Sequence, residues 1–208
     1  LEQAFGHLQH VRPGQWHYMT GMSITDFDQY EHLGRLQHLV KSNSELASTL
    51  GSEYIIKPDI IVARSPISDE EVNANQLLVS EDYPEIASLT PLRETNSSRF
   101  LLHASISCKW TLRSDRSQNA RSEALNLIRH RKGHSPHIVA LTAEPLPTRI
   151  ASLALGTGDI DCVYHFALPE LKNAIIQIDN EDQLDMLEIL IGGRRLRDIS
   201  DLPFDLAI

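Results

Sequence analysis

Two strand-like runs of apolar residues, each next to a charged side chain, place the strongest constraint on how this chain can fold. Asp59 stands directly before the β-branched run 60–63, and the longer run 100–110 has Lys109 near its end. Such residues favour β-strands. Two neighbouring strands would bring Asp59 and Lys109 together although the chain separates them. The sequence therefore predicts that a carboxylate and an ammonium group converge on adjacent strands.

The residues beside these two refine the prediction. Pro58 precedes Asp59 and interrupts a strand-like stretch that begins at residue 53. Side chains alternate between the two faces of a strand. Ser107 and Lys109 should therefore share one face, while Cys108 points to the other.

A carboxylate and a lysine in this arrangement suit hydrolysis of a phosphodiester. Mg²⁺ prefers oxygen ligands and usually takes one or two protein carboxylates, and a nearby lysine stabilises negative charge on the phosphate. Residues 119–130 show a helical pattern that stops at Gly133, and Glu123 lies in its early turns. A helix that folds back on the lysine strand would present Glu123 as a second metal ligand beside Asp59.

A segment whose side chains are suited to contacts with DNA bases follows Lys109, and it is called the reading segment below. The segment Arg113-Ser114-Asp115-Arg116 places two arginines and an aspartate close together. Arginine donates a bidentate pair to guanine O6 and N7, and aspartate accepts from cytosine N4. Together with the predicted metal site, this segment makes sequence-specific cleavage of DNA the leading hypothesis.

Taken together, these motifs resemble the NgoMIV-type restriction endonucleases, a branch of the PD-(D/E)XK nuclease superfamily. In this branch the second carboxylate has moved from the residue two before the lysine onto the following helix. Ser107 stands at the position that has lost the carboxylate, and Glu123 stands at the new one. The resemblance runs over most of the chain, through to residues 195–203.

The resemblance implies a type II restriction endonuclease that requires Mg²⁺. It implies recognition of GCCGGC or a related site with a CCGG centre, leaving four-base 5′ extensions. Similar enzymes are homotetramers, built as two dimers back to back, which bind two copies of double-stranded DNA. A cognate methyltransferase would act on the same site and need not bind the enzyme.

The resemblance also assigns roles within the catalytic site. Asp59 and Glu123 would bind Mg²⁺, with the backbone carbonyl of Cys108 as a further ligand. Lys109 would stabilise the scissile phosphate and help to position the water. Ser107 would shape the site.

For base recognition, the resemblance implies that the reading segment contacts the central CCGG in the major groove. Arg113, Asp115 and Arg116 match the family residues that read these bases, with Ser114 between them. Arg149 matches, by position, the arginine that reads the outer guanine.

The start of the chain carries one more expected site residue. The family has another active-site glutamate on an early helix, and Glu2 is the candidate. The chain begins at Leu1 without an initiator Met, and similar enzymes are longer before this point. We therefore expect a single endonuclease domain over residues 1–208, which is either an N-terminally truncated fragment or part of a chain with further residues before Leu1.

Composition sets the remaining expectations. The chain has 208 residues, of which 41% are apolar, and helix and strand patterns alternate without repeats. This predicts an α/β domain with a central mixed β-sheet flanked by helices, as in the restriction-endonuclease-like core. We expect helices over 24–50, near 69–76, and over 147–155, 169–176 and 180–192, and strands over 137–142 and 161–166. The absence of a membrane-spanning apolar run and two cysteines without a disulfide framework favour a cytoplasmic protein.

The charge distribution agrees with a DNA partner although the net charge is −9. Residues 109–132 hold seven Lys or Arg against two acidic residues, so this segment is +5 and the remainder is −14. Phosphate contacts from such a segment position a protein on DNA, while a few arginines specify the sequence.

Each of these residues, taken alone, also has an ordinary structural interpretation. Asp59 after a proline is commonly a turn residue, Lys109 a solvated strand end, and Arg113–Arg116 an exposed turn. For the whole set, two further functions remain as alternatives. One is a DNA-binding module of the same fold that does not cleave, which would not need Asp59 or Lys109. The other is a repair or junction-resolving nuclease, which reads DNA shape and needs no guanine reader beside its lysine.

Overall fold

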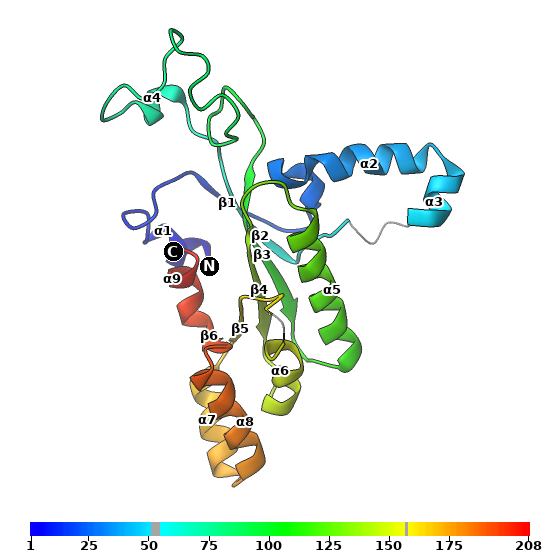
Figure 1. Ribbon diagram of the computed structural model, residues 1–208. Coiled ribbons are helices and arrows are strands. Elements are labelled where there is room, and N and C mark those ends of the chain that lie inside the picture. Colours follow the sequence, from blue (N-terminus) through cyan, green and yellow to red (C-terminus); the bar gives the residue numbers. More distant parts are fainter. Residues whose placement is uncertain (51–54, 157) are drawn as a thin grey trace.

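A six-stranded mixed sheet forms the centre of the molecule and carries helices on both faces (Figure 1). The computed structural model describes residues 1–50, 55–156 and 158–208. Along the sheet the strands follow one another in chain order. They are β1 (Trp16–Met19), β2 (Ile60–Arg64), β3 (Leu101–Lys109), β4 (His137–Thr142), β5 (Cys162–His165) and β6 (Leu196–Asp198).

The sheet has an antiparallel half and a parallel half, which meet at β3. β1 pairs with β2 and β2 with β3 in antiparallel fashion, whereas β3 to β6 are all parallel. Parallel neighbours require crossover helices, and these lie between successive strands of this half. The predicted mixed sheet flanked by helices is therefore confirmed.

The helices differ widely in length. The longest is α5, which connects β3 to β4. The described α-helices are α1 (Glu2–Gly6), α2 (Glu31–Lys41), α3 (Ser44–Leu50), α4 (Asp69–Val72), α5 (Ser114–His130), α6 (Pro147–Ala154), α7 (Leu168–Gln177), α8 (Glu181–Gly192) and α9 (Leu202–Asp205). Among the described residues, no helix is both long enough and apolar enough to cross a membrane.

Apolar side chains pack on both faces of the sheet. One cluster joins Ile61, Ala140 and Val163 of the strands to α5, α6 and α8. The other joins Val62, Ile106 and their neighbours to α1 and α9 on the opposite face. Figure 1 shows α5 and α6 on one side of the sheet and α1 and α9 on the other.

α5 lies against the sheet through small side chains. Its buried residues are Ser117, Ala120, Ala124 and Leu127, which share one face of the helix at spacings of three and four. The small residues allow a close approach to the strands, while polar and basic side chains fill the exposed face. Acidic Asp115 in the first turn and basic residues in the last turn also favour the helix through its dipole.

The predicted helix over 24–50 is wrong as a single element. Residues 24–30 form two 3₁₀ turns, the first closed by a capping box between Ser23 and Asp26. α2 and α3 are then separated at Asn43, whose side chain accepts hydrogen bonds from the backbone of Glu45 and Leu46. Such a cap starts a new helix. The expected stop at Gly51 lies outside the described residues.

Two other boundaries differ from the sequence expectations. Residues 55–57 are not in a strand, and residues 53 and 54 lie outside the described residues. α5 begins at Ser114 rather than at Asn119. Arg113 before it is extended, and the fully buried Leu112 anchors the preceding loop. The reading segment therefore forms the first turn of the helix and not an independent turn.

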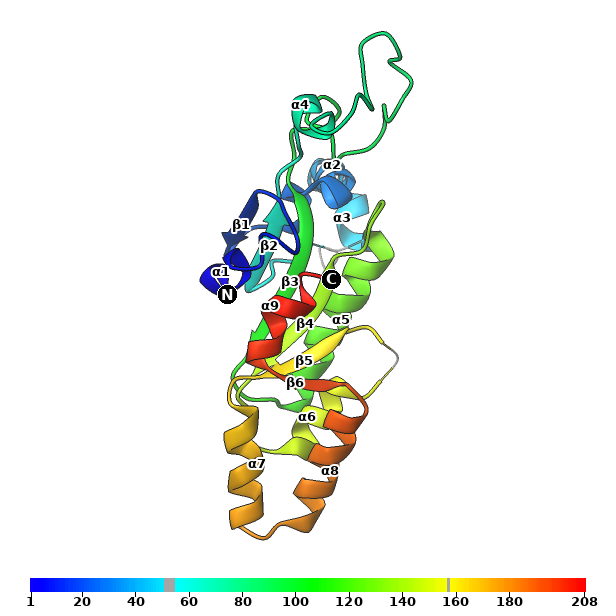
Figure 2. The ribbon, with the colours of Figure 1, turned by 90° about the vertical axis from the view of Figure 1, so that its left-hand side faces the viewer.

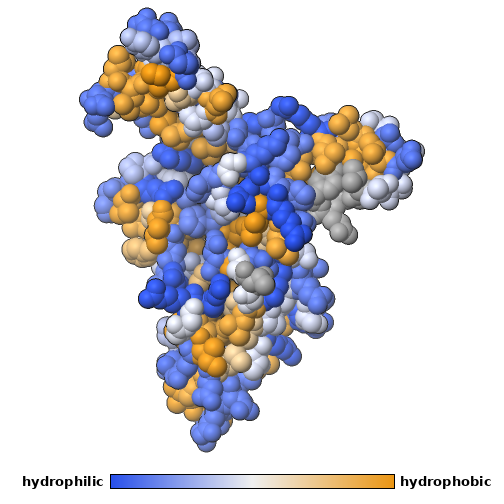
Figure 3. Space-filling model, viewed as in Figure 1, coloured by the Kyte–Doolittle hydropathy of each residue, from blue (hydrophilic) through white to orange (hydrophobic). Residues whose placement is uncertain are grey.

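The segment between β2 and β3 projects from the body of the molecule, with α4 at its base (Figures 1 and 2). Arg93 pairs with both carboxylate oxygens of Asp69 at 2.8 and 2.7 Å, which fixes this base. Figure 3 shows apolar patches on the projection. Its exposed large apolar residues are Leu77, Leu78, Tyr83, Ile86 and Leu89.

Candidate active site

Asp59 and Lys109 meet because β2 and β3 run antiparallel. Ile60 pairs with Ile106, so the residue before β2 faces the end of β3. Oδ2 of Asp59 accepts a hydrogen bond from the backbone N–H of Cys108 at 2.7 Å and from Nζ of Lys109 at 3.2 Å. The structure thus brings together two residues that the chain holds far apart.

Side-chain alternation along β3 separates the three residues of the lysine motif. Cys108 packs with the apolar cluster on the α1 face, and burial raises the pKa of its thiol, with the nearby Asp59 carboxylate raising it further. A thiol of this kind stays protonated and inert. Ser107 lies on the same face as Lys109, and its buried Oγ has no hydrogen-bond partner among the described residues. An unpaired buried hydroxyl is uncommon and indicates a place for a ligand or water.

Glu123 reaches the same end of the sheet from α5. Burial raises the pKa of its carboxyl group, the Lys109 ammonium lowers it, and the Asp59 carboxylate raises it again. Glu123 therefore lies within the electrostatic range of both other charges. A cavity of about 720 Å³ opens beside it, lined by residues 55–57 and by polar side chains of α5 that include Asn119.

The donor set fits a magnesium ion. Asp59 and Glu123 supply two carboxylates, and the Ser107 hydroxyl adds a polar group that has no other partner. No group of three or more His, Cys, Asp or Glu that could hold a metal occurs among the described residues. Mg²⁺ does not need such a group, because it keeps several waters and is commonly bound by one or two carboxylates together with substrate phosphates.

The reading segment is exposed at the start of α5. Arg113 is the N-cap residue, and Ser114, Asp115 and Arg116 follow in the first turn. All four side chains are exposed, and Arg116 Nη1 donates to Oγ1 of Thr111 at 3.2 Å. The positive end of the helix dipole adds to the attraction for anions such as phosphate.

Arg149 lies in the first turn of α6, and its side chain is 55% exposed. Its Nη1 is 3.7 Å from Oε1 of Glu144, a completely buried residue that sequence reasoning missed. The only signal for Glu144 was a glutamate just before a proline-started helix. That pattern does not reveal burial.

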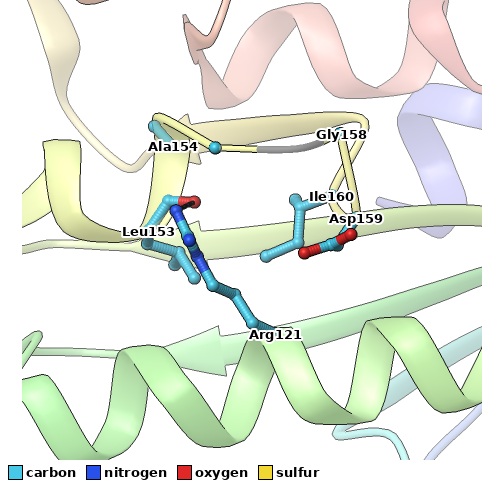
Figure 4. Close-up of a pocket in the computed structure, with 7 residues that line it drawn as sticks. Arg121, Leu153, Ala154, Gly158, Asp159 and Ile160 are labelled. Carbon is cyan, nitrogen blue, oxygen red and sulfur yellow. Dashed lines mark hydrogen bonds between the residues drawn. The ribbon is translucent and has the colours of Figure 1, made fainter.

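Hydrogen bonds hold α5 and α6 side by side. Oγ of Ser117 lies 3.0 Å from Oγ of Ser152. One turn further along α5, Arg121 donates to the carbonyl oxygens of Leu153, at 3.4 Å, and of Leu155. Figure 4 shows Arg121 extending from α5 across a small pocket to the end of α6. The reading segment at the start of α5 and Arg149 at the start of α6 are therefore carried by two helices that are bonded to each other.

Glu2 is not brought to this site by any contact among the described residues. It is the first residue of α1, which packs on the opposite face of the sheet. Its charge acts on Tyr18, whose pKa rises to about 12, mainly through burial and secondarily through Glu2. The catalytic role of Glu2 stays a prediction.

The mixed sheet, with an aspartate and a lysine at the ends of adjacent strands, has the fold of the restriction endonucleases. The model of the NgoMIV restriction enzyme family matches residues 1–208, and the chain belongs to this family. It is 54% identical to the type II restriction enzyme NgoMIV of Neisseria gonorrhoeae, across the whole of this chain and 73% of that protein. The protein is therefore a type II restriction endonuclease, a site-specific nuclease whose substrate is DNA, and the alternatives of a repair nuclease and a non-cleaving module are set aside.

Proposed function

We propose that this enzyme cleaves double-stranded DNA at GCCGGC, or at a related site with a CCGG centre, in a Mg²⁺-dependent reaction that leaves four-base 5′ extensions. One observation carries the proposal. α5 holds Glu123 at the Asp59–Lys109 pair, has Arg113 as its N-cap residue and carries Asp115 and Arg116 in its first turn. A single helix thus links the proposed metal site to the proposed base readers.

Asp59 and Glu123 would hold the metal ion, with the Cys108 backbone carbonyl as a third ligand from the protein. When bound, Mg²⁺ polarises the phosphate and lowers the pKa of an attacking water. The raised pKa of Glu123 supports this assignment. Burial and the Asp59 charge disfavour the ionised carboxylate, and a divalent cation between the two carboxylates would offset that cost.

Lys109 would neutralise charge on the scissile phosphate. Its ammonium group is paired with Asp59 at 3.2 Å and is 21% exposed, so it is close to the metal ligand and still accessible. The hydroxyl of Ser107 lies on the same face and is free to donate to a water or to a phosphate oxygen. These groups would orient the water and the phosphate without being consumed.

The exposed segment at the start of α5 would read the central CCGG. Arg113 and Arg116 suit the guanine edges, Asp115 suits cytosine N4, and Ser114 lies between them. Arg149 would read the outer guanine from the start of α6. Each good bidentate pair contributes about 1–3 kcal/mol of discrimination.

We also propose that the enzyme acts as a homotetramer, a dimer of dimers that engages two DNA sites. The apolar patches on the projection between β2 and β3 support assembly through this segment, because monomeric proteins rarely expose large contiguous apolar patches. A methyltransferase of the same specificity would protect the host DNA without binding the enzyme.

Two plasmids test this function, one with a single GCCGGC site and one with two. We expect Mg²⁺-dependent cuts at this sequence, with four-base 5′ ends on sequencing and a faster reaction on the two-site plasmid. Lys109→Ala is the control for contaminating nucleases. Defined cuts at another sequence would replace the proposed site, and equal rates on both plasmids would contradict the paired-site tetramer.

A further inference from the structure

Glu144 lies between β4 and α6, and it is 0% exposed. A carboxylate removed from water is costly unless its oxygens are well hydrogen bonded. Both oxygens of Glu144 are used. Oε2 accepts from the backbone N–H of Leu112 at 2.7 Å, and Oε1 accepts from the backbone N–H of Leu146 at 3.2 Å and lies 3.7 Å from Arg149.

The backbone of Glu144 is fixed as firmly as its side chain. Its N–H donates to Oγ1 of Thr142 at 3.1 Å, and its carbonyl accepts from Nε2 of His165 at 3.2 Å. Nδ1 of His165 accepts from the backbone N–H of Ala167, so both contacts require the neutral imidazole. Burial lowers the pKa of His165 and keeps the ring in this form.

The two ends of the carboxylate reach the two helices that carry the proposed base readers. Leu112 directly precedes Arg113, the N-cap residue of α5. Leu146 is the N-cap residue of α6, and Arg149 lies in the first turn of that helix. One buried side chain therefore sets where α5 begins relative to α6.

We infer that Glu144 is a positioning residue for DNA recognition, which couples the reader of the outer base pair to the readers of the central CCGG. This inference rests on the proposed function. The backbone contacts of Glu144 would hold α5 and α6 in register throughout. The 3.7 Å contact with the half-exposed Arg149 would orient the guanidinium in the free enzyme. On DNA binding, this weak contact would break and let Arg149 reach the outer guanine.

A direct role in metal binding does not fit Glu144. Both oxygens are occupied by N–H donors, and the residue is closed to solvent. The Asp59 side chain, by contrast, is 46% exposed, and Glu123 lines an open cavity. Glu144 acts through the segments that it ties together.

Glu144→Gln tests the inference, since an amide keeps the shape of the side chain but loses one acceptor and the charge. The measurement is kcat/KM with Mg²⁺ on GCCGGC, on the outer-changed duplex ACCGGT and on the centre-changed duplex GCATGC. We expect both discrimination ratios to fall at least about tenfold, within the range that one bidentate contact supplies. Affinity for a duplex without the site should change little, whereas the melting temperature should fall, because the amide NH2 leaves one buried backbone N–H without an acceptor. Glu188→Gln, at an exposed glutamate paired with Lys172, is the matched control and should leave every value unchanged.

Each result separates the inference from the function on which it rests. A loss confined to the outer base pair would reduce Glu144 to a partner of Arg149 and overturn the coupling. Unchanged ratios would overturn the positioning role while leaving the proposed site intact. A wild-type enzyme that does not distinguish the three duplexes would overturn the proposed site itself. If Glu144→Gln does not fold, Glu144→Asp, which retains the charge but shortens the reach, is measured instead, and wild-type ratios in that variant overturn the inference.

Discussion

Asp59 engages Lys109 through one carboxylate oxygen only. Oδ2 receives both the Lys109 ammonium and the backbone N–H of Cys108, and no hydrogen bond from the described residues reaches Oδ1. The oxygen that is bound orients the carboxylate, and the other oxygen stays available for a cation. The pair therefore places a proposed metal ligand directly beside a proposed phosphate-stabilising ammonium group.

Replacing Lys109 with alanine should abolish most of the cleavage without unfolding the protein. Loss of a preorganised charge-stabilising donor commonly costs about 10²–10³ in rate, whereas an exposed ion pair contributes only about 0–1 kcal/mol to stability. Single-turnover cleavage, DNA affinity and thermal melting check this. Lys172→Ala, at another exposed ion pair, is the control. Loss of DNA binding in step with cleavage would contradict a catalytic role for Lys109.

Replacing Glu123 with glutamine should stabilise the metal-free protein at alkaline pH and remove its response to Mg²⁺. Burial raises the pKa of this carboxyl group in the folded state. A raised pKa means that its favourable contribution is present below the unfolded pKa and is lost as pH rises through the folded pKa. Melting curves without metal at pH 5 and pH 8 should therefore diverge more for the wild type than for the variant. Added Mg²⁺ should raise the melting temperature of the wild type only; an equal rise in both proteins would remove Glu123 from the metal site.

Replacing Arg116 with alanine should reduce affinity for the cognate site far more than affinity for random DNA. A lost guanine contact costs about 1–3 kcal/mol at the cognate site, whereas a lost phosphate contact weakens binding to every sequence. Fluorescence anisotropy with both duplexes over a range of salt concentrations distinguishes the two. Arg129→Ala, at the other end of α5, provides a control with the same change in charge. Equal losses on cognate and random DNA would contradict base reading by Arg116.

Replacing Leu89 with serine should weaken assembly. Leu89 is 93% exposed on the projection between β2 and β3, so the substitution removes an apolar contact of any interface there without disturbing the core. Light scattering at several protein concentrations should show smaller particles for this variant and a reduced preference for two-site plasmids. Ile178→Ser, at an exposed position after α7, is the control. An unchanged mass would place the interface elsewhere.

Much of the fold could be predicted where the pattern was strong. The strand 137–142 matches β4, and the amphipathic stretch ending at Gly192 matches α8 with Asn180 as its cap. The short elements β1, β6 and α9 were not predicted, and an early helix at α1 was expected from the resemblance alone. Their stability depends on tertiary packing rather than on local pattern, as when Phe5 of α1 packs edge-on against Trp16 of β1.

The sequence predicted the charged residues of the site, but it did not predict the buried residue that connects the surrounding segments. The motifs around Asp59 and Lys109 named residues that the antiparallel pairing of β2 and β3 brings together. Glu144 was invisible, because a glutamate in a loop is usually exposed and only the folded chain shows that Leu112 and Leu146 surround it. Glu2 was named from the resemblance alone, and in the structure its charge raises the pKa of Tyr18 on the α1 face of the sheet.

α5 carries the proposed readers of the central CCGG at its N-cap and first turn and Glu123 about two turns later, on one uninterrupted helix. Each residue in an α-helix advances the side chains by about 100°. An insertion or deletion between the readers and Glu123 would therefore rotate the proposed metal ligand away from the scissile phosphate whenever the readers kept their place on the bases. On the proposed assignments, substitutions at the start of α5 would alter the sequence preference, whereas a change in length between the readers and Glu123 would uncouple recognition from cleavage.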